Sequence, residues 1–339
     1  MKKIEKFSKS SKDIINIKKD FFTENNKLYK NSIKINKFLT KQKKRKKCKN
    51  CGNNIFSYDF ISHGVKYKIC SKCNHLNGMY EESSNFLNYL YRDDPNSNYS
   101  KTYLKNYEER VDKIYLPKAK FLKKVINKKK ITILEIGSGG GHFLKACEKI
   151  RVTGLGFESN NKLVSLANKK LIKNKVSLVN LHNSINKIKN TKADCLVLIS
   201  VLEHVQNPNQ LIKAFKESKI KFLYIVVPLF SLSVYFENIF KGVYPRLLGG
   251  AHTHIYSKQS LDYLVKKFKF KIVGEWWFGN EFVDLFRSIS VKSEFFGKNK
   301  IFFKHFKKIF IENIDNFQKI LDKKKLSSQV HIVLSKKTK

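Results

Sequence analysis

Short apolar runs alternate with amphipathic stretches through the middle of the chain, beginning at residue 131. The apolar runs have the length of buried strands, and in the stretches between them apolar positions recur at the steps of three and four typical of helices. The predicted strands are 131–136, 152–157, 176–181, 194–199 and 223–227, and the predicted helices are 141–150, 160–170 and 208–217. Such an alternation indicates a parallel sheet with helices on both faces.

The pattern changes after Pro228, where an irregular stretch extends to about residue 256. A helix over 260–268 and a strand over 270–276 follow, and 330–334 forms a last strand. Between these strands, apolar residues at steps of three and four predict a long amphipathic helix: Phe303, Phe306, Phe310, Ile314, Phe317 and Leu321. Its apolar face has three interpretations, namely a homodimer contact, a membrane-surface contact or core packing.

A glycine-rich segment, Glu-Ile-Gly-Ser-Gly-Gly-Gly, joins the first of these strands to the helix after it. Glycines let the backbone turn tightly and approach a ligand, and the free N–H groups of the following helix attract a carboxylate. The dinucleotide-binding pattern Gly-x-Gly-x-x-Gly fails here, because its last position, counted from Gly137, is His142. The segment therefore predicts a nucleotide-like ligand other than a nicotinamide cofactor.

Two further segments carry ligand-binding chemistry at the carboxyl ends of predicted strands. Glu158 ends the second strand, where a carboxylate can accept hydrogen bonds from both ribose hydroxyls. The fourth strand leads into Ser-Val-Leu-Glu-His-Val and then Pro208, at the sheet edge where doubly wound folds bind ligands. His204 in this segment is either a general base or a packed residue at the start of a helix.

Together these segments resemble motif I and the fourth-strand motif of the class I S-adenosylmethionine (SAM)-dependent methyltransferases. The resemblance implies an α/β fold with a seven-stranded Rossmann-like sheet whose last strand is antiparallel, and SAM as the cofactor. It places the cofactor contacts at Glu135, Gly137, Ser138, Gly139, Gly141, Glu158, Ser159, Asn183, Ser200 and Val201. The acid that binds adenine in many relatives is not evident after the third strand, where His182 or Asn183 takes its place.

Four of the six cysteines form two Cys-x-x-Cys pairs, Cys48 with Cys51 and Cys70 with Cys73. Two such pairs can present four thiolates to a tetrahedral Zn²⁺, and four protein ligands indicate a structural zinc ion. The predicted organisation is a Lys-rich segment over 1–47, a zinc-ribbon-like module over 48–80, a helical linker or lid over 81–128 and the methyltransferase domain over 129–339.

Lys and Arg number 69 against 27 Asp and Glu, so the net charge is +42. Only six of the basic residues are arginine, although phosphate-binding surfaces favour arginine, and the many Lys, Asn and Ile residues are typical of an AT-rich coding sequence. The sequence shows neither a signal peptide nor a run of apolar residues long enough to span a membrane, and the cysteine usage fits a reducing compartment. A cytoplasmic protein is expected.

The irregular stretch after the fifth strand is the expected acceptor region. His252 and His254 would share one face of an extended segment, and either can take a proton from an acceptor hydroxyl. The alternative is a structural histidine pair, and a metal role lacks an obvious third ligand. Candidate acceptor contacts are Arg246, Tyr256, Trp277 and Arg287.

The four-cysteine module joined to this domain also resembles methyltransferases from bacterial surface-polysaccharide and sugar-modification clusters, as do the segments Tyr-Pro-Arg, His-Thr-His and Glu-Trp-Trp-Phe-Gly. This resemblance implies methyl transfer to a nucleotide-sugar or glycan, to oxygen or alternatively to carbon. A second hypothesis is an RNA methyltransferase whose zinc ribbon and lysines hold RNA. A non-catalytic scaffold is the third, disfavoured by the intact cofactor motif.

Overall fold

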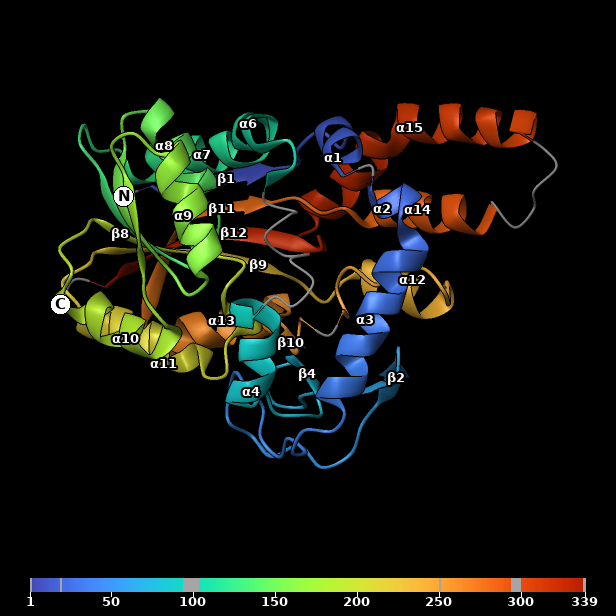
Figure 1. Cartoon of the computed structure of the whole chain (residues 1–339), viewed down its shortest axis with the longest axis horizontal. Helices are drawn as coiled ribbons and strands as arrows, with labels where there is room; N and C mark the ends of the chain where they lie inside the picture. Colours follow the sequence, from blue (N-terminus) through green and yellow to red (C-terminus); the bar gives the residue numbers. More distant parts are fainter. Residues whose placement is uncertain (1, 19, 94–103, 250, 294–299, 338–339) are drawn as a thin grey trace.

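The computed structural model describes residues 2–18, 20–93, 104–249, 251–293 and 300–337. An eight-stranded sheet forms its centre, in the order β1-β11-β12-β9-β8-β5-β6-β7 (Figure 1). The strands are β1 (Ile4–Phe7), β5 (Thr132–Ile136), β6 (Thr153–Glu158), β7 (Lys175–Leu178), β8 (Cys195–Ile199), β9 (Phe222–Pro228), β11 (Phe270–Trp277) and β12 (Gln329–Lys336). Strand β12 runs antiparallel to both of its neighbours, and the other pairings are parallel.

The predicted fold class is confirmed, since all seven expected strands are present in a Rossmann-like sheet whose last strand is antiparallel. The eighth strand, β1, comes from the Lys-rich N-terminal segment and pairs in parallel with β11. Its short Ile-Glu-Lys-Phe sequence buries little apolar surface, which explains why the hydrophobic pattern did not predict it.

Helices cover both faces of the sheet. Apolar side chains of α10 (Leu181–Asn190), α11 (Pro208–Glu217) and α13 (Lys258–Lys267) pack on one face. Those of α7 (Leu116–Ile126), α8 (His142–Lys149) and α9 (Asn161–Lys170) pack on the other. The carboxyl ends of β5, β6 and β8 therefore form an edge that is open between the two helical layers, where the fold binds its ligand.

A second sheet lies beside the first and contains segments far apart in sequence. It is antiparallel, in the order β10-β4-β3-β2, and consists of β2 (Phe60–Ser62), β3 (Val65–Ile69), β4 (Leu76–Gly78) and β10 (His254–Ile255). The sheets thus cross the predicted domain boundaries, because β1 pairs with β11 and β10 pairs with β4. That division into segments stays a prediction.

The described residues form further helices outside these two layers. They are α1 (Lys12–Ile17), α2 (Asp20–Thr23), α3 (Asn25–Leu39), α4 (Ser84–Leu87), η1 (Asn88–Asp93), α6 (Tyr107–Arg110), η2 (Val111–Tyr115), η3 (Leu202–His204), α12 (Leu232–Ile239), α14 (Glu281–Ser293) and α15 (Lys300–Lys323). Helix α12 lies in the stretch that was expected to be irregular.

Helix α15 is the predicted long amphipathic helix, and it packs against α14 through Ile314 and its phenylalanines (Figure 1). Several of its apolar residues, among them Phe302 and Ile309, are exposed. Within the described residues, no helix combines the length and the apolar character needed to cross a membrane.

Candidate active site

Two adjoining cavities lie at the carboxyl ends of β5, β6 and β8. The first has a volume of about 450 Å³ and extends from the glycine turn to α3 and the segment around residue 250. The second has a volume of about 840 Å³ and extends from Glu158 to the start of α10. Both are lined by Tyr91, Gly137, Ser200 and His204. A ligand the length of SAM can therefore reach from one cavity into the other.

The glycine turn takes a shape that requires glycine. Gly137, Gly139 and Gly141 have φ values of 70°, 52° and 76°, in the left-handed region that other residues rarely adopt. A Cβ atom on Gly137 would lie 2.9 Å from Cγ2 of Val201. The turn thus brings β5 close to the segment after β8, which leaves room for a ligand against bare backbone.

Glu158 lies where the resemblance placed a ribose-binding carboxylate. Its Oε2 accepts a hydrogen bond from the Gly139 N–H at 2.9 Å, and its Oε1 accepts from the N–H groups of Ser159 and Asn160 at 2.8 and 2.9 Å. Oε2 accepts a single hydrogen bond and so keeps a lone pair for a ribose hydroxyl. Glu158, Ser159, Val201, His182 and Asn183 all line the second cavity.

Glu135 and Lys118 both line the first cavity and lie within electrostatic range of each other. Burial raises the pKa of the Glu135 carboxyl well above its usual value, and its Oε2 has no hydrogen-bond partner among the described residues. Burial likewise lowers the pKa of Lys118 to about 7, and no acidic side chain of the described residues forms an ion pair with it. Ser138 lines the same cavity. Lys118 is one lysine among several in its helix, so the sequence pattern did not single it out.

His204 and His252 meet in the first cavity, with ring centroids 4.8 Å apart. The Nδ1 of His204 lies 2.7 Å from the Ala251 carbonyl oxygen, and that of His252 lies 2.9 Å from the Leu247 carbonyl oxygen. Burial lowers the pKa of His204 to about 4 and that of His252 to about 3, so both imidazoles are uncharged at neutral pH.

Glu203 completes this histidine pair, although the sequence analysis did not single it out. Its side chain is buried, and its Oε1 lies 3.9 Å from the Nε2 of His204. Among the described residues its carboxylate oxygens form no hydrogen bond within 3.5 Å. Burial raises the pKa of Glu203 to about 8, although the nearby Ser200 hydroxyl and the Glu203 N–H favour the charged form. The Leu-Glu-His sequence identified the segment, but only the fold places this carboxylate near His252.

Several acceptor candidates lie away from both cavities. His254 is fully buried with its Nδ1 2.8 Å from the Nε2 of His75, and Tyr256 packs against the same rings. His252 and His254 therefore do not share a face, because His252 precedes β10 in a turn. Trp277 belongs to the sheet core. The helix residue Arg287 is 2% exposed and reaches Asp284 at 3.9 Å.

Arg246 is the predicted acceptor contact that does line the first cavity. Its guanidinium group forms a bidentate contact with Asp284, in which Nε donates to Oδ1 at 3.0 Å and Nη2 donates to Oδ2 at 2.6 Å. Glu237 accepts hydrogen bonds from the N–H groups of Arg246, Leu247 and Leu248, and so fixes this loop.

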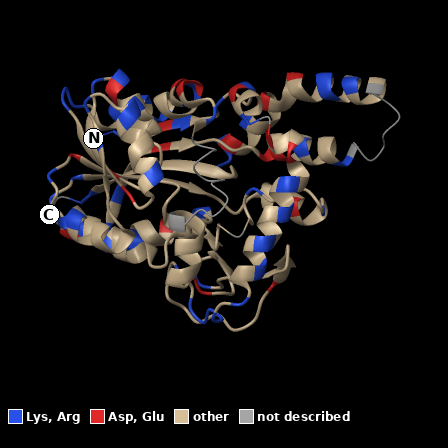
Figure 2. Ribbon diagram, viewed as in Figure 1, with Lys and Arg blue, Asp and Glu red and all other residues tan. Residues whose placement is uncertain are grey.

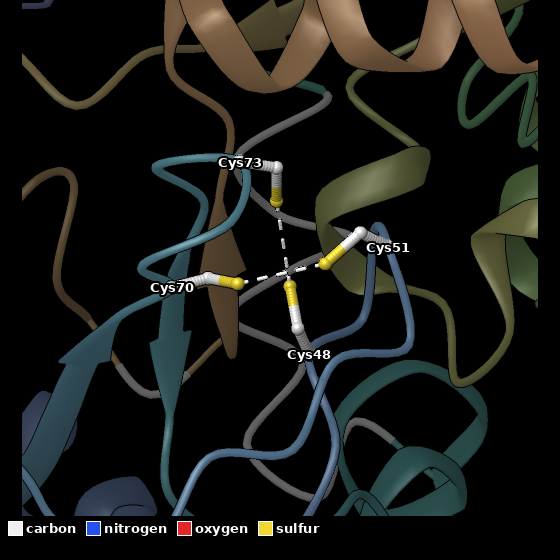
Figure 3. Close-up of side chains that lie close together, drawn as sticks. All are labelled: Cys48, Cys51, Cys70 and Cys73. Carbon is white, nitrogen blue, oxygen red and sulfur yellow. Dashed lines mark hydrogen bonds between the residues drawn. The ribbon is translucent and has the colours of Figure 1, made fainter.

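The four predicted metal-binding cysteines converge in the N-terminal module (Figure 3). The sulfur atoms of Cys48 and Cys73 lie 3.7 Å apart, and those of Cys51 and Cys70 lie 3.5 Å apart. Thiolates that bind one tetrahedral zinc ion lie about 3.8 Å from one another, since each Zn–S bond is about 2.3 Å. The cluster therefore has the dimensions of a zinc site.

Hydrogen bonds from side chains connect this cysteine cluster to the main domain. Asn50 donates a hydrogen bond to the Ser260 carbonyl oxygen at 2.8 Å, and Asn209 donates to the Asn50 carbonyl oxygen at 3.0 Å. Strand β4 follows Cys73 and pairs with β10, and the Gly78 N–H donates to the Thr253 carbonyl oxygen at 2.9 Å. The module thus positions the segment that carries His252.

Comparisons with known proteins agree with this architecture. The family model described as a methyltransferase domain matches residues 103–275. Solved structures similar to the chain include a SAM-dependent methyltransferase from Archaeoglobus fulgidus, with 15% identity and a TM-score of 0.43 over 69% of this chain and 100% of that one. Magnesium protoporphyrin IX methyltransferase from Synechocystis PCC 6803 has 9% identity and a TM-score of 0.48 over 76% and 100%.

A plantazolicin methyltransferase has 14% identity and a TM-score of 0.46 over 74% of this chain and 93% of that one. No curated protein matches the sequence. The family match covers just over half of the chain and includes the glycine turn, Glu158 and the segment with His204. The chain belongs to the methyltransferase domain family and is a SAM-dependent methyltransferase.

Proposed function

We propose that the enzyme transfers the methyl group of SAM to a hydroxyl oxygen of a sugar that carries phosphate, such as a nucleotide-sugar. The observation that supports this acceptor most strongly is the first cavity, which combines polar aromatic side chains with cationic ones. Tyr89, Tyr91 and Tyr244 line it together with Lys118 and Arg246. Flat aromatic faces suit sugar rings, and the cations suit phosphate.

The cofactor would occupy both cavities. Its ribose would bind Glu158, and its adenine would lie near His182 and Asn183 in the second cavity. Its methionine end would pass the glycine turn into the first cavity. The methyl group would then lie near Ser200 and His204, which line both cavities. The cofactor supplies the electrophile, and the protein aligns the acceptor with it.

The charge balance around the first cavity favours an anionic acceptor. Lys118 lies within electrostatic range of Lys9, Lys18 and Arg110 and of one acid, Glu135. Lys18 lies within range of Arg110 and Arg246 and of one acid, Asp284. Arg246 is neutralised by Asp284, but neither Lys118 nor Lys18 forms an ion pair with a described acidic residue. Buried like charges repel one another, and a bound phosphate would stabilise them.

Acceptor activation is proposed to occur at His204 and His252 rather than at His254. The first two line the cavity, whereas His254 is buried against His75. Both cavity histidines are uncharged at neutral pH and can accept a proton from the attacking hydroxyl. A structural Zn²⁺ on Cys48, Cys51, Cys70 and Cys73 would hold β4 and thereby β10 in place.

The RNA alternative receives less support from the distribution of charge. Figure 2 shows Lys and Arg on helices throughout the molecule rather than on one face of the cysteine module. An RNA-binding enzyme is expected to concentrate its cations along one binding surface.

Transfer of labelled methyl groups from SAM to a panel of acceptors tests the proposal. The panel contains nucleotide-sugars, sugar phosphates, neutral glycans and total RNA. We expect label in a phosphate-bearing sugar, lost in Glu158→Ala and retained in the surface variant Lys72→Ala. Label that appears only in RNA, or only in a neutral glycan, would contradict the proposed acceptor.

A further inference from the structure

We propose that Glu203, His204 and His252 bind a divalent transition-metal ion beside the transferred methyl group. One ligand atom from each residue lies within 4.8 Å of the other two. Octahedral ligands about 2.1 Å from an ion are about 3.0 Å apart in cis positions and about 4.2 Å apart in trans positions. A small inward movement of the side chains therefore closes the three ligands on an ion.

Both imidazoles have the tautomer that metal binding requires. The Nδ1 atoms of His204 and His252 lie 2.7 and 2.9 Å from backbone carbonyl oxygens. The Tyr91 hydroxyl, which can share the same proton as an acceptor, lies 2.8 Å from Nδ1 of His204. A carbonyl oxygen only accepts hydrogen bonds, so each Nδ1 carries the proton and each Nε2 keeps its lone pair. Metal-binding histidines are oriented in this way by a hydrogen bond from the nitrogen that does not bind the metal.

Glu203 would become the anionic ligand once a metal ion displaces its proton. Its side chain is fully buried, and its carboxylate oxygens form no hydrogen bond within 3.5 Å in the described part of the chain. Within that part, only the Ser200 hydroxyl and the backbone N–H of Glu203 itself lie near enough to stabilise its charged form. A buried carboxylate in this state is costly, and it is retained in proteins mainly where a cation or a reaction uses it. A metal ion held by His204 and His252 would satisfy it.

The remaining coordination positions would face the acceptor. His204 and His252 line the first cavity, whereas Glu203 lies behind them. Two imidazoles and one carboxylate suit first-row divalent ions and leave open positions for other ligands. This site is separate from the four cysteines, whose thiolates form their own cluster.

This step rests on the proposed function and changes one part of it. With their Nε2 lone pairs bound to the ion, His204 and His252 would no longer accept the proton, and the ion itself would activate the acceptor oxygen. A hydroxyl bound to a divalent cation loses its proton more easily, and water can take that proton. The oxygen then donates an electron pair to the methyl carbon, and the carbon–sulfur bond breaks with its electrons left on sulfur. The products are the methyl ether and neutral S-adenosylhomocysteine.

Manganese binding tests the site without any acceptor. The protein is treated with a weak chelator, its cysteine-bound zinc is verified by elemental analysis, and Mn²⁺ binding is measured by electron paramagnetic resonance. We expect one Mn²⁺ per chain in addition to zinc. Glu203→Gln and His252→Gln should each weaken Mn²⁺ binding by more than about tenfold. The matched controls Glu108→Gln and His63→Gln, outside both cavities, should bind as the wild type does.

Calorimetric titration with SAM shows whether each variant retains its cofactor site. If a variant fails to fold, pulsed electron paramagnetic resonance on the wild-type protein still tests the site. Imidazole nitrogens bound to Mn²⁺ modulate the electron spin echo of the ion. Absence of that modulation, absence of Mn²⁺ beyond zinc, or unchanged affinity in folded variants would overturn the metal site. None of these results depends on which acceptor is methylated. Failure of the metal site can therefore be distinguished from failure of the proposed sugar acceptor.

Discussion

The backbone conformation of Ser200 sets the direction of the segment that carries Glu203 and His204. Its φ of 52° lies in the left-handed region, which is uncommon for a residue other than glycine. The strained turn begins directly after β8 and leads into η3, which contains Glu203 and His204. Backbone strain of this kind persists where surrounding structure holds it, and it is concentrated at functional sites.

His331 is predicted to make folding stability depend on pH. It is fully buried in β12, where the Tyr224 hydroxyl lies 2.5 Å from its Nδ1, and burial lowers its pKa well below the usual value of about 6.5. The unfolded chain therefore binds a proton at a higher pH than the folded chain does. Stability is fully present above pH 6.5 and falls as the pH decreases, by up to about 1.4 kcal/mol per pH unit from this group.

Urea unfolding of the wild type and His331→Gln at pH 5.5 and 7.5 measures this effect. The variant is expected to lose less stability on acidification than the wild type loses. An equal loss in both proteins would show that His331 is not the group responsible.

At the scale of elements, two glycines of β6 control its packing against α8 and the glycine turn. A Cβ atom on Gly154 would lie 2.6 Å from Cγ1 of Ile133, and one on Gly156 would lie 2.2 Å from Oγ of Ser138. Gly154→Ala and Gly156→Ala are each expected to lower the free energy of unfolding by about 1–3 kcal/mol.

The two variants should differ in cofactor binding. Only Gly156→Ala displaces Ser138 in the glycine turn, so it should weaken SAM binding by more than about tenfold, or about 1.4 kcal/mol. Calorimetric titration with SAM checks this, with Gly154→Ala as the matched control. Equal SAM affinities in the two variants would show that β6 can accommodate a Cβ atom at position 156 without displacing the glycine turn.

The cysteine module is predicted to support acceptor activation more than cofactor binding. Cys51→Ser removes one of the four sulfur ligands, while β4 and β10 connect the module to the segment of His252. We expect reduced zinc content, a lower unfolding temperature and methyl transfer reduced by more than tenfold, with SAM affinity nearly unchanged. Lys72→Ala, an exposed position between two of the cysteines, is the control. Wild-type activity in zinc-free Cys51→Ser would refute the supporting role.

The sequence predicted strands correctly where burial on both faces requires a run of apolar residues. Helices cover both faces of β5, β8 and β9, so most residues of these strands are apolar and easily recognised. Helix α3 lines the first cavity through Leu28 and Ile35, yet it lies in a Lys-rich segment of weak periodicity. The apolar side chains of α3 line a cavity and pack in a small cluster rather than in a broad core.

For the whole molecule, the net charge of +42 is predicted to limit stability through self-repulsion. Salt screens charges over about 10 Å at 0.1 M, so added NaCl should raise the unfolding temperature. Between 0.02 and 0.3 M we expect a rise of at least about 3 °C, equivalent to roughly 2 kcal/mol at this chain length. A scan at pH 10.5, where many lysines are neutral, should show a smaller rise. A falling temperature would indicate that ion pairs outweigh the repulsion.

The sequence by itself determined the sheet, the glycine turn, Glu158 and the two cysteine pairs. These features are local, because burial, backbone conformation and ligand spacing are written into neighbouring residues. Only the tertiary structure decided which of the distant side chains meet. It joined Glu203 to His252, separated His252 from His254, and brought Lys118 and α3 to the first cavity. Such contacts form where elements that are distant in sequence pack against one another, and the spacing of residues along the chain does not predict them.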